Sequence, residues 1–440
     1  MFVAGYSYRW VILVCGVLAY ATSYLTRWSY TGLASFIQED LQLDKADLGV
    51  LGSAFFYTYA LVQVPWGKSA DRWGGRTVIP LGVLLSAGGL LGFTLAQSFG
   101  EAIGWRVMIG LVAASVFVPV ASLLSHWFAS EDRGFANGIY YGFGGGLGQA
   151  TAFLLLPLLH VFFLDRIDSV FSGWRGAMGL VALIVAGLGV GCWVFLRSYP
   201  PQPETKGAVL APSQSISQTT PNSRVASITK DPILWCLGGY FAAGIIALRL
   251  VPGWLTIFAS EWYHVEQGYS QTDAVIAGGV MGTVYTIGHV AGSPLLGKLS
   301  DRLAAYGIGR FQCAAMVLGL GAVSVSCLTV PMGTPWMLGG VALLLGVTLH
   351  AFPIINAAVS DRWGGHRTGH ALGWINMVGQ LAGAVALSVS GYLGLAWASG
   401  ATGTVAEYAG IWYLAAGACV FGAGCGWLAH RLTKTVVRIS

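Results

Sequence analysis

The chain has 440 residues, of which 55% are hydrophobic and only 9% are charged, and its mean hydropathy is +0.68. Soluble globular proteins carry about 25% charged residues, and disordered chains are poor in apolar ones, so both classes are excluded. The net charge of +5 is spread over short loops without a dense basic cluster, which excludes a nucleic-acid partner. We therefore expect a polytopic helical protein embedded in a lipid bilayer.

A helix needs about 20 apolar residues to cross the hydrocarbon core, and the sequence holds twelve such runs. The first six spans are expected at residues 10–35, 48–67, 77–97, 102–126, 135–163 and 173–197. The second six are expected at 233–258, 272–297, 311–331, 335–359, 369–396 and 406–430.

The segment between the sixth and seventh spans, residues 198–230, is rich in Pro, Ser, Thr and Gln. It is typical of a polar linker, which divides the chain into an N-terminal half (1–197) and a C-terminal half (231–440). With both termini on the same side as this linker, 17 of the 23 Lys and Arg residues fall there. The positive-inside rule then predicts a cytoplasmic linker and cytoplasmic termini, and we expect a bacterial inner membrane.

Two loops repeat one another. Residues 67–76 read GKSADRWGGR, residues 297–310 read GKLSDRLAAYGIGR, and each loop follows the second span of its half. Parallel halves related by an axis along the membrane normal are described for one large class of secondary transporters. The sequence thus predicts an all-α membrane protein with twelve transmembrane helices in two pseudo-symmetric six-helix halves.

The first of these loops resembles the signature Gly-x-x-x-Asp-Arg-x-Gly-Arg-Arg of the major facilitator superfamily, with Gly75 in place of one arginine. Arg106-x-x-x-Gly110 resembles the family's fourth-helix motif. The resemblance implies the major facilitator fold. It also implies a gating role for six residues: Asp71, Arg72, Arg76, Asp301, Arg302 and Arg106.

The first span resembles a narrower branch, the anion:cation symporters and organophosphate antiporters, through Tyr24-Leu25-Thr26-Arg27. In that branch the matching arginine binds the anion, and Arg249 matches the second anion-binding arginine of the antiporters. The sequence departs from the branch where many proton-coupled members carry an acid, at Thr26 and near Ala113. It also departs near Gly144, where the antiporters carry a histidine, and this weighs against phosphate-ester exchange.

Arg27 and Arg249 lie 17 and 16 residues into their spans, where a charge costs about 2.5–3.5 kcal/mol by insertion scales. All 18 Asp and Glu residues fall in loops or at span ends, so no carboxylate is expected to neutralise either arginine. Two guanidinium groups facing one cavity can hold a carboxylate or a phosphate bidentately. The alternatives are arginines that snorkel to the interface or pair with a buried acid.

Further cavity-lining candidates are polar or aromatic residues on the helices that surround the substrate in such folds: Tyr24, Tyr57, Tyr140, Asn356, Trp374 and Asn376. Interfacial belts and helix–helix contacts are the alternative roles. His289 and His350 are the titratable groups within spans, so they are proton-coupling candidates or hydrogen-bonded packing groups. The run GFGGGLG (142–148) favours close helix contact.

We therefore expect a secondary active transporter, and no enzyme, that moves a small organic acid, sugar acid or similar anion by alternating access, in the manner of a symporter. Antiport of phosphate esters or inorganic anions, and transport of a metal ion or chelate, remain open. A membrane enzyme would need a buried nucleophile and base, which the spans lack, and gate motifs weigh against a channel. We expect no cofactor and no bound metal, and a monomer.

Overall fold

A computed structural model describes residues 2–164, 166, 170–200, 231–350, 354–355, 358–359, 365–398 and 403–439. The expected linker, apart from its first three residues, and Asn356 lie outside the described residues, as does the side chain of Asp71. In the described ranges all regular secondary structure is helical, as the apolar composition predicts.

The N-terminal half contains the six expected spans. They are α1 (Phe2–Gly32), α3 (Lys45–Trp73), α4 (Gly75–Thr94), α5 (Phe99–Trp127), a composite fifth span (α6 Ser130–Gly138, η1 Ile139–Gly144, α7 Gly145–Ala150, η2 Thr151–Leu155, α8 Leu156–Leu164) and α9 (Gly173–Phe195). The first span ends earlier than expected, and the chain turns at Leu33 into the short helix α2 (Ala34–Leu41). This helix buries Phe36 and Ile37 but exposes Glu39 and Asp40, so it lies across one end of the half.

The C-terminal half repeats this arrangement with α11 (Pro232–Val265), α12 (Gln271–Ala305), α13 (Arg310–Ser326) with η3 (Cys327–Thr329), α14 (Pro335–Thr348), α16 (Gly365–Ala398) and α17 (Thr404–Ile439). Ten spans of the described chain are long and apolar enough to cross a membrane, and α14 is a shorter apolar helix. The 29-residue α3 completes the twelve. Several helices outrun their expected ends because helical structure continues into charged residues beyond the apolar core.

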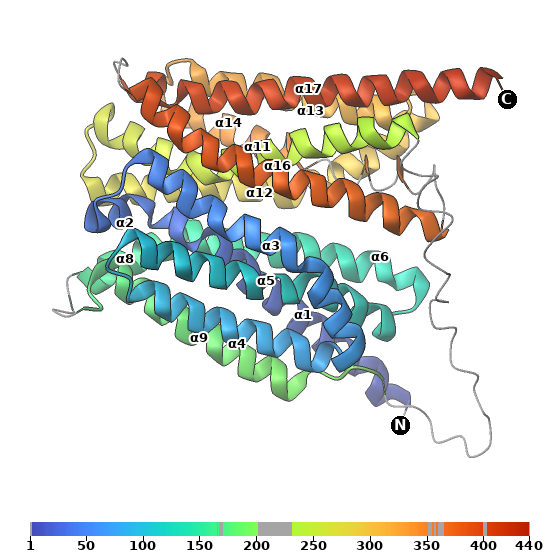
Figure 1. The fold of residues 1–440 in the computed structure, drawn as a ribbon, viewed down its shortest axis with the longest axis horizontal. Helices are drawn as coiled ribbons and strands as arrows, with labels where there is room; N and C mark the ends of the chain where they lie inside the picture. Colours follow the sequence, from blue (N-terminus) through green and yellow to red (C-terminus); the bar gives the residue numbers. More distant parts are fainter. Residues whose placement is uncertain are drawn as a thin grey trace.

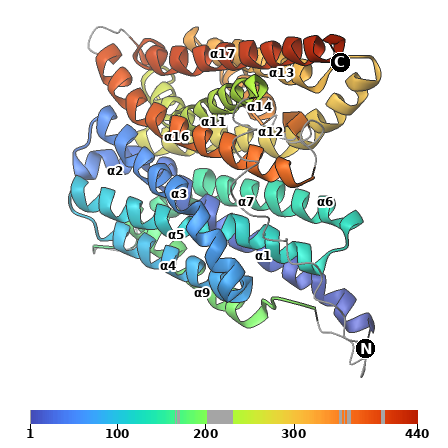
Figure 2. The same cartoon turned by 45° about the vertical axis from the view of Figure 1, so that its right-hand side comes forward.

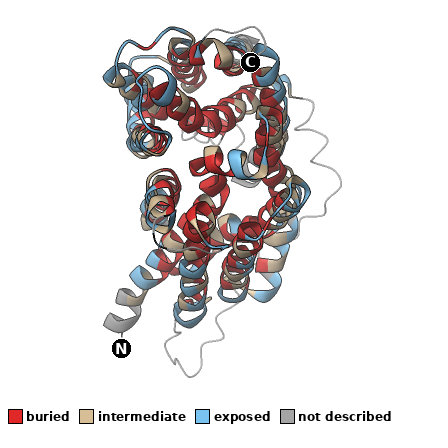
Figure 3. Ribbon diagram, turned by 90° about the vertical axis from the view of Figure 1, so that its left-hand side faces the viewer, coloured by how far each residue is buried: buried red, intermediate tan, exposed pale blue. Residues whose placement is uncertain are grey.

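The two halves lie side by side, and both termini lie at the same end of the molecule (Figure 1). We call this the terminal end and the opposite one the far end. The turned view separates the group formed by α1 to α9 from the group formed by α11 to α17 (Figure 2). Viewed from the far end, buried residues lie on the surfaces that the helices turn toward each other (Figure 3). Large apolar residues such as Leu183 and Phe421 are exposed on the periphery, as expected of a lipid-facing surface.

The halves meet along a seam between α3 and α16 toward the far end. A Cβ added at Gly49 would lie 2.9 Å from the Cα of Gly391, so the two backbones are in direct contact. The Ser388 hydroxyl donates to Ser53 at 2.7 Å and lies 3.2 Å from the hydroxyl of Tyr57. This seam, comprising Gly49, Ser53, Tyr57, Ser388 and Gly391, closes the far end.

An ion-pair cluster caps the seam. Lys45 at the start of α3 lies 2.7 Å from Glu407 of α17 and 3.3 Å from Glu261 of α11. The Tyr408 hydroxyl donates to Glu261 at 2.7 Å, and the Lys45 ammonium lies 4.2 Å from the Tyr408 ring centroid. One cation of the N-terminal half is thus held by two carboxylates of the C-terminal half.

The glycine run of the fifth span packs against α1, as the sequence predicts. A Cβ at Gly148 would lie 2.0 Å from the carbonyl oxygen of Ala21, and one at Gly144 would lie 2.9 Å from that of Val17. The helix widens into π-turns on both sides of α7, a feature that the apolar periodicity does not reveal. These contacts bring the fifth span close to the helix that carries Arg27.

Candidate functional site

A cavity of about 670 Å³ lies between the halves and includes both arginines. Its remaining walls are mainly aromatic and amide side chains: Tyr20, Tyr59, Gln63, Phe117, Asn137, Tyr140, Tyr141, Phe241, Asn376 and Gln380. The cavity extends from the arginines toward the terminal end, where its lining residues Gly138 and Gly373 are exposed. The seam and the Lys45 cluster join the halves on its other side, so the described residues connect the cavity to the terminal end.

The Arg27 side chain is surrounded by aromatic rings, and its backbone is held by Arg106 of the same half. Its side chain is buried, with the guanidinium carbon 4.5 Å from the ring centroid of Tyr24 and 4.9 Å from that of Tyr59. Arg106 of α5 donates to the carbonyl oxygens of Arg27, at 3.2 Å, and of Thr26, at 3.1 Å. These bonds fix the backbone from which Arg27 projects.

Arg249 faces Arg27 from α11 of the other half. Its guanidinium carbon lies 4.0 Å from the ring centroid of Phe56, and its Nη2 donates to Oε1 of Gln380 at 2.6 Å. A Cβ at Gly383 would lie 2.9 Å from the Cγ of Arg249, so α16 packs directly against the arginine side chain.

Neither cation is neutralised by an acid. No carboxylate occurs among the described residues that line the cavity, and the Nε of each arginine is buried without a hydrogen-bond partner in that part of the chain. Aromatic faces stabilise a cation but accept no hydrogen bonds in the plane of the guanidinium. The site can therefore bind an anion with charge-assisted hydrogen bonds from both halves.

The other predicted cavity residues separate into distinct environments. Tyr140 and Asn376 line the cavity, and Tyr24 contacts Arg27 without being part of the wall. Tyr57 lies in the seam, bonded to Ser388. Trp374 is not among the lining residues and packs edge-on against Trp235, with ring centroids 5.7 Å apart.

His289 of α12 and His350, which follows α14, form a stacked pair. Their ring centroids lie 3.5 Å apart, with the planes inclined by 16°, and both side chains are buried. The Nδ1 of His350 lies 2.9 Å from the carbonyl oxygen of Gly346, so this nitrogen donates and Nε2 is the nitrogen left to take a proton. The hydroxyl of Ser293, a cavity residue, donates to the backbone carbonyl of His350 at 3.4 Å.

The predicted gating residues do not form one cluster. Arg72, Arg76, Asp301 and Arg302 lie exposed at the terminal end, and Asp301 accepts a 2.8 Å bond from Arg310 of its own half. Arg106 is the sixth residue for which the resemblance implies a gating role. It is 1% exposed and its hydrogen bonds go to backbone carbonyls of α1 and α3. These contacts favour a positioning role for Arg106, because all of them stay within one half.

Sequence reasoning missed three features: the amides Gln63 and Gln380, the tyrosines Tyr20 and Tyr59, and the Lys45 cluster. Gln380 follows Asn376 by four residues, and this spacing places both on one helix face. The spacing was therefore a signal in the sequence that Gln380 belongs to the same site as Asn376. The partners of Lys45 are 216 and 362 residues away, and no local pattern connects them.

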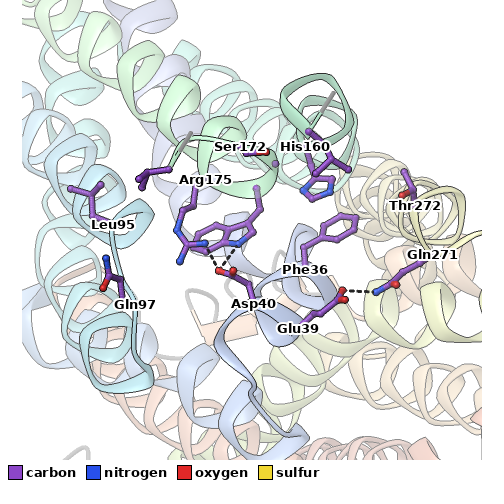
Figure 4. A pocket seen from close by; sticks show the side chains of 14 residues that line it. Phe36, Glu39, Asp40, Leu95, Gln97, His160, Ser172, Arg175, Gln271 and Thr272 are labelled. Atoms are coloured by element: carbon purple, nitrogen blue, oxygen red, sulfur yellow. Dashed lines mark hydrogen bonds and ion pairs between the residues drawn. The ribbon is translucent and has the colours of Figure 1, made fainter. Parts of the chain in front are cut away.

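A second cavity, of about 770 Å³, lies at the far end and is a different kind of site. Asp40 faces Arg175 and Trp174 there, and Glu39 accepts a 3.1 Å bond from Gln271 of the other half (Figure 4). Its charged groups are already paired and two of them are acids, so it offers an anion far less than the two-arginine cavity does.

Twelve helices in two six-helix halves around a central cavity define the fold class expected from the sequence. The chain belongs to the Major Facilitator Superfamily, whose family model matches residues 16–387. Within the superfamily, the similarity falls in the anion:cation symporter and organophosphate antiporter branch.

The matches to curated relatives cover only part of each relative. A probable hexose phosphate transport protein of Chlamydia pneumoniae is 24% identical over 65% of this chain and 63% of the relative. A probable galactarate/D-glucarate transporter of Bacillus subtilis, GudP, is 25% identical over 68% and 66%. The nitrate/nitrite transporter NrtP of a Picosynechococcus strain is 26% identical over 44% and 39%. The chain thus spans at most two thirds of the length of these relatives.

A solved structure shares the fold over nearly the whole chain. It is the bacterial homologue of the human lysosomal transporter Spinster in an inward-facing, occupied conformation. The TM-score is 0.73 with 20% identity, over 96% of this chain and 97% of that one.

Proposed function

We propose that this protein is a secondary active transporter that binds one small anion between Arg27 and Arg249 and releases it on the opposite side by alternating access. The observation that carries the proposal is the pair of buried guanidinium groups, one from each half, on a cavity whose described lining residues include no carboxylate. An anion that bridges the two cations contacts both halves at once. Its binding free energy therefore depends on how the two halves are placed relative to each other.

The cavity favours an organic anion over a small inorganic one. Its volume of about 670 Å³ and its tyrosine and amide walls provide hydrogen-bonding groups and apolar surface in addition to the charges. A sugar acid or another hydroxylated carboxylate uses all of them, and relatives named for galactarate and D-glucarate support this class. A phosphate ester is the second candidate, supported by the hexose phosphate relative. A free metal cation would be repelled.

We further propose that residues 1–197 and 231–440 rock as two bodies connected by the linker 198–230, with termini and linker in the cytoplasm of a bacterial cell. In this orientation the cavity opens inward. The exposed loops with Asp71, Arg72, Arg76, Asp301 and Arg302 would then meet and separate at the cytoplasmic side as the state changes. We assign no catalytic activity or cofactor to the chain.

Transport by the purified protein in proteoliposomes tests the proposal. Uptake of radiolabelled D-glucarate is measured with and without unlabelled glucose 6-phosphate, nitrate or one of a panel of sugar acids. The anions that compete identify the substrate class. Arg27→Lys and Arg249→Lys should each weaken anion binding about 10- to 100-fold, because lysine keeps the charge but loses the planar fork. Arg166→Lys, at the far-end turn after α8, is the matched control. Full transport in either arginine variant contradicts the two-arginine site.

A further inference from the structure

Three amide side chains connect Arg249 to the other half of the molecule. Arg249 donates to Oε1 of Gln380 at 2.6 Å, Gln380 donates through Nε2 to Oδ1 of Asn376 at 3.3 Å, and Asn376 donates through Nδ2 to Oε1 of Gln63 at 3.2 Å. Gln380 and Asn376 belong to α16, whereas Gln63 belongs to α3. We propose that this amide chain is an anion-released latch between the halves, and that Gln380 is the group displaced from Arg249 by the incoming anion. The proposal rests on the anion site proposed above.

The direction of every bond in the amide chain is set by the arginine. A guanidinium only donates hydrogen bonds, so Gln380 has to present its carbonyl oxygen to Arg249. Its NH₂ group therefore points toward Asn376, which has to accept with its own oxygen and donate to Gln63. A change at Arg249 therefore alters which group of each amide donates and which accepts, as far as Gln63 in the other half.

Helix packing gives the amide chain little freedom. Asn376 and Gln380 are four residues apart and lie on one face of α16. Gly379 and Gly383 let that helix approach α11, since Cβ atoms there would lie 2.7 Å from Phe241 Cδ1 and 2.9 Å from Arg249 Cγ. The Gln380 side chain is buried. With Arg249 pressed against α16, the one hydrogen bond seen from its guanidinium to the described residues goes to this amide oxygen.

An anion changes this arrangement. A carboxylate or phosphate oxygen is a stronger partner for a guanidinium than a neutral amide oxygen, so an anion at Arg249 takes the place of Oε1 of Gln380. The freed amide is no longer constrained in orientation, and it can turn its NH₂ to the anion. Asn376 then loses the donor that fixed it, and its bond to Gln63 across the halves weakens. The empty protein stays latched and the loaded protein is free to move.

The latch predicts that the halves move against each other mainly when an anion is bound. Without an anion, the Asn376–Gln63 bond holds α3 and α16 in the present arrangement, which slows return of the empty transporter. Exchange of one anion for another should therefore be faster than net flux. Loss of the latch should raise net flux relative to exchange.

Distance measurements between the halves test this directly. Spin labels at Phe135→Cys and Tyr306→Cys, in a background without the seven native cysteines, report the terminal end, because both positions are exposed there and neither lines the cavity. With Gln63 intact we expect D-glucarate, or glucose 6-phosphate or nitrate as parallel probes, to raise the population of the terminal-end-closed state. Gln63→Leu should show that population without any anion, raised about two- to tenfold, the range for loss of one hydrogen bond.

The control is Ser53→Ala, which removes a bond of the same α3–α16 seam that is not connected to Arg249. In this variant the anion should still raise the population of the terminal-end-closed state. If Gln63→Leu has the same anion-free distance distribution as the parent protein, or if Ser53→Ala also loses the response to the anion, the latch is wrong. Anion binding by the parent, measured separately by calorimetry, reports on the proposed function, so failure of the anion site and failure of the latch give different results.

Discussion

At the residue scale, the cavity keeps two cations in place without acids. Arg27 is stabilised by the rings of Tyr24 and Tyr59, and Arg249 by Phe56 and one amide oxygen. An internal carboxylate would compete with the substrate for the guanidinium groups, whereas aromatic faces do not. Among the described residues the cavity wall has no carboxylate to carry a proton, so coupling of the proposed transport to a proton gradient needs another group.

The His289–His350 pair is our candidate for that group. Two charged imidazoles with centroids 3.5 Å apart would repel strongly, so the pair can hold one proton and not two. Tyr285 of α12 is its aromatic neighbour, 5.8 Å from His350. The hydroxyl of Ser293, on the cavity wall, donates to the backbone carbonyl of His350, so the pair lies beside the cavity that holds Arg249. A bound anion lowers the positive charge of this cavity and so favours a proton on the pair, which links anion binding to proton uptake.

We predict that an imposed pH gradient, acidic on the uptake side, drives D-glucarate accumulation in sealed vesicles. His289→Gln and His350→Gln should each abolish the gradient effect while exchange at equal pH continues. His126→Gln, on an exposed surface at the end of α5, serves as control. Accumulation driven by pH that persists in the double variant would rule out the pair and place the proton carrier at another group, such as Asp47, Glu101 or Asp273. If the pH gradient drives no accumulation even in the parent protein, exchange or drive by membrane potential, about 2.3 kcal/mol per charge per 100 mV, is the better explanation.

At the element scale, glycines determine how closely the helices approach and therefore where the arginines lie. The contact of α16 with α11 at Gly383 positions the Arg249 side chain, and the contact of the fifth span with α1 at Gly144 and Gly148 supports the Arg27 helix. Small residues allow this approach in a membrane, where helix association depends on packing.

Gly383→Ala should weaken anion binding without unfolding the protein. The new methyl group would lie 2.9 Å from Arg249 Cγ and 2.7 Å from Ile245 Cγ2, so the arginine has to move, at a cost of about 1–3 kcal/mol. We expect binding reduced about 10-fold or more by calorimetry. Gly238→Ala is the matched control on the same helix as Arg249, because a Cβ there meets nothing within 4 Å. Equal affinity in the two variants would contradict this role of Gly383.

At the scale of the whole molecule, sequence reasoning predicted what local composition determines. Apolar runs and the duplicated loops indicated twelve helices in two halves, and the cost of a buried charge singled out Arg27 and Arg249. The closure of the far end was not predictable in this way. The bonds of Lys45 to Glu261 and Glu407 and the backbone contact of Gly49 with Gly391 join segments more than 200 residues apart. Such contacts arise only when the halves are assembled in one particular state.

The Lys45 cluster should therefore control which state is populated. Lys45→Met leaves Glu261 and Glu407 close together without their shared cation, and their side chains are only 30% and 34% exposed. Removal of one partner from a buried ion pair costs about 3–5 kcal/mol, and partial exposure reduces this, so we expect roughly a 10-fold rise in the far-end-open population. The readout is the distance between spin labels at Gln97→Cys and Gln267→Cys, exposed far-end positions in opposite halves.

Two further variants separate a gate from a general loss of stability. Arg175→Met breaks the ion pair with Asp40, which lies at the same end but within one half, and it should leave the distance distribution as in the parent. Neutralising all three groups, with Lys45→Met, Glu261→Gln and Glu407→Gln, leaves no unpaired charge and should return most molecules to the closed far end. If Lys45→Met and Arg175→Met open the far end equally, the cluster contributes only to stability. If the triple variant stays as open as Lys45→Met, the opening does not arise from unpaired carboxylates, because the charge repulsion is then gone while the remaining seam is unchanged.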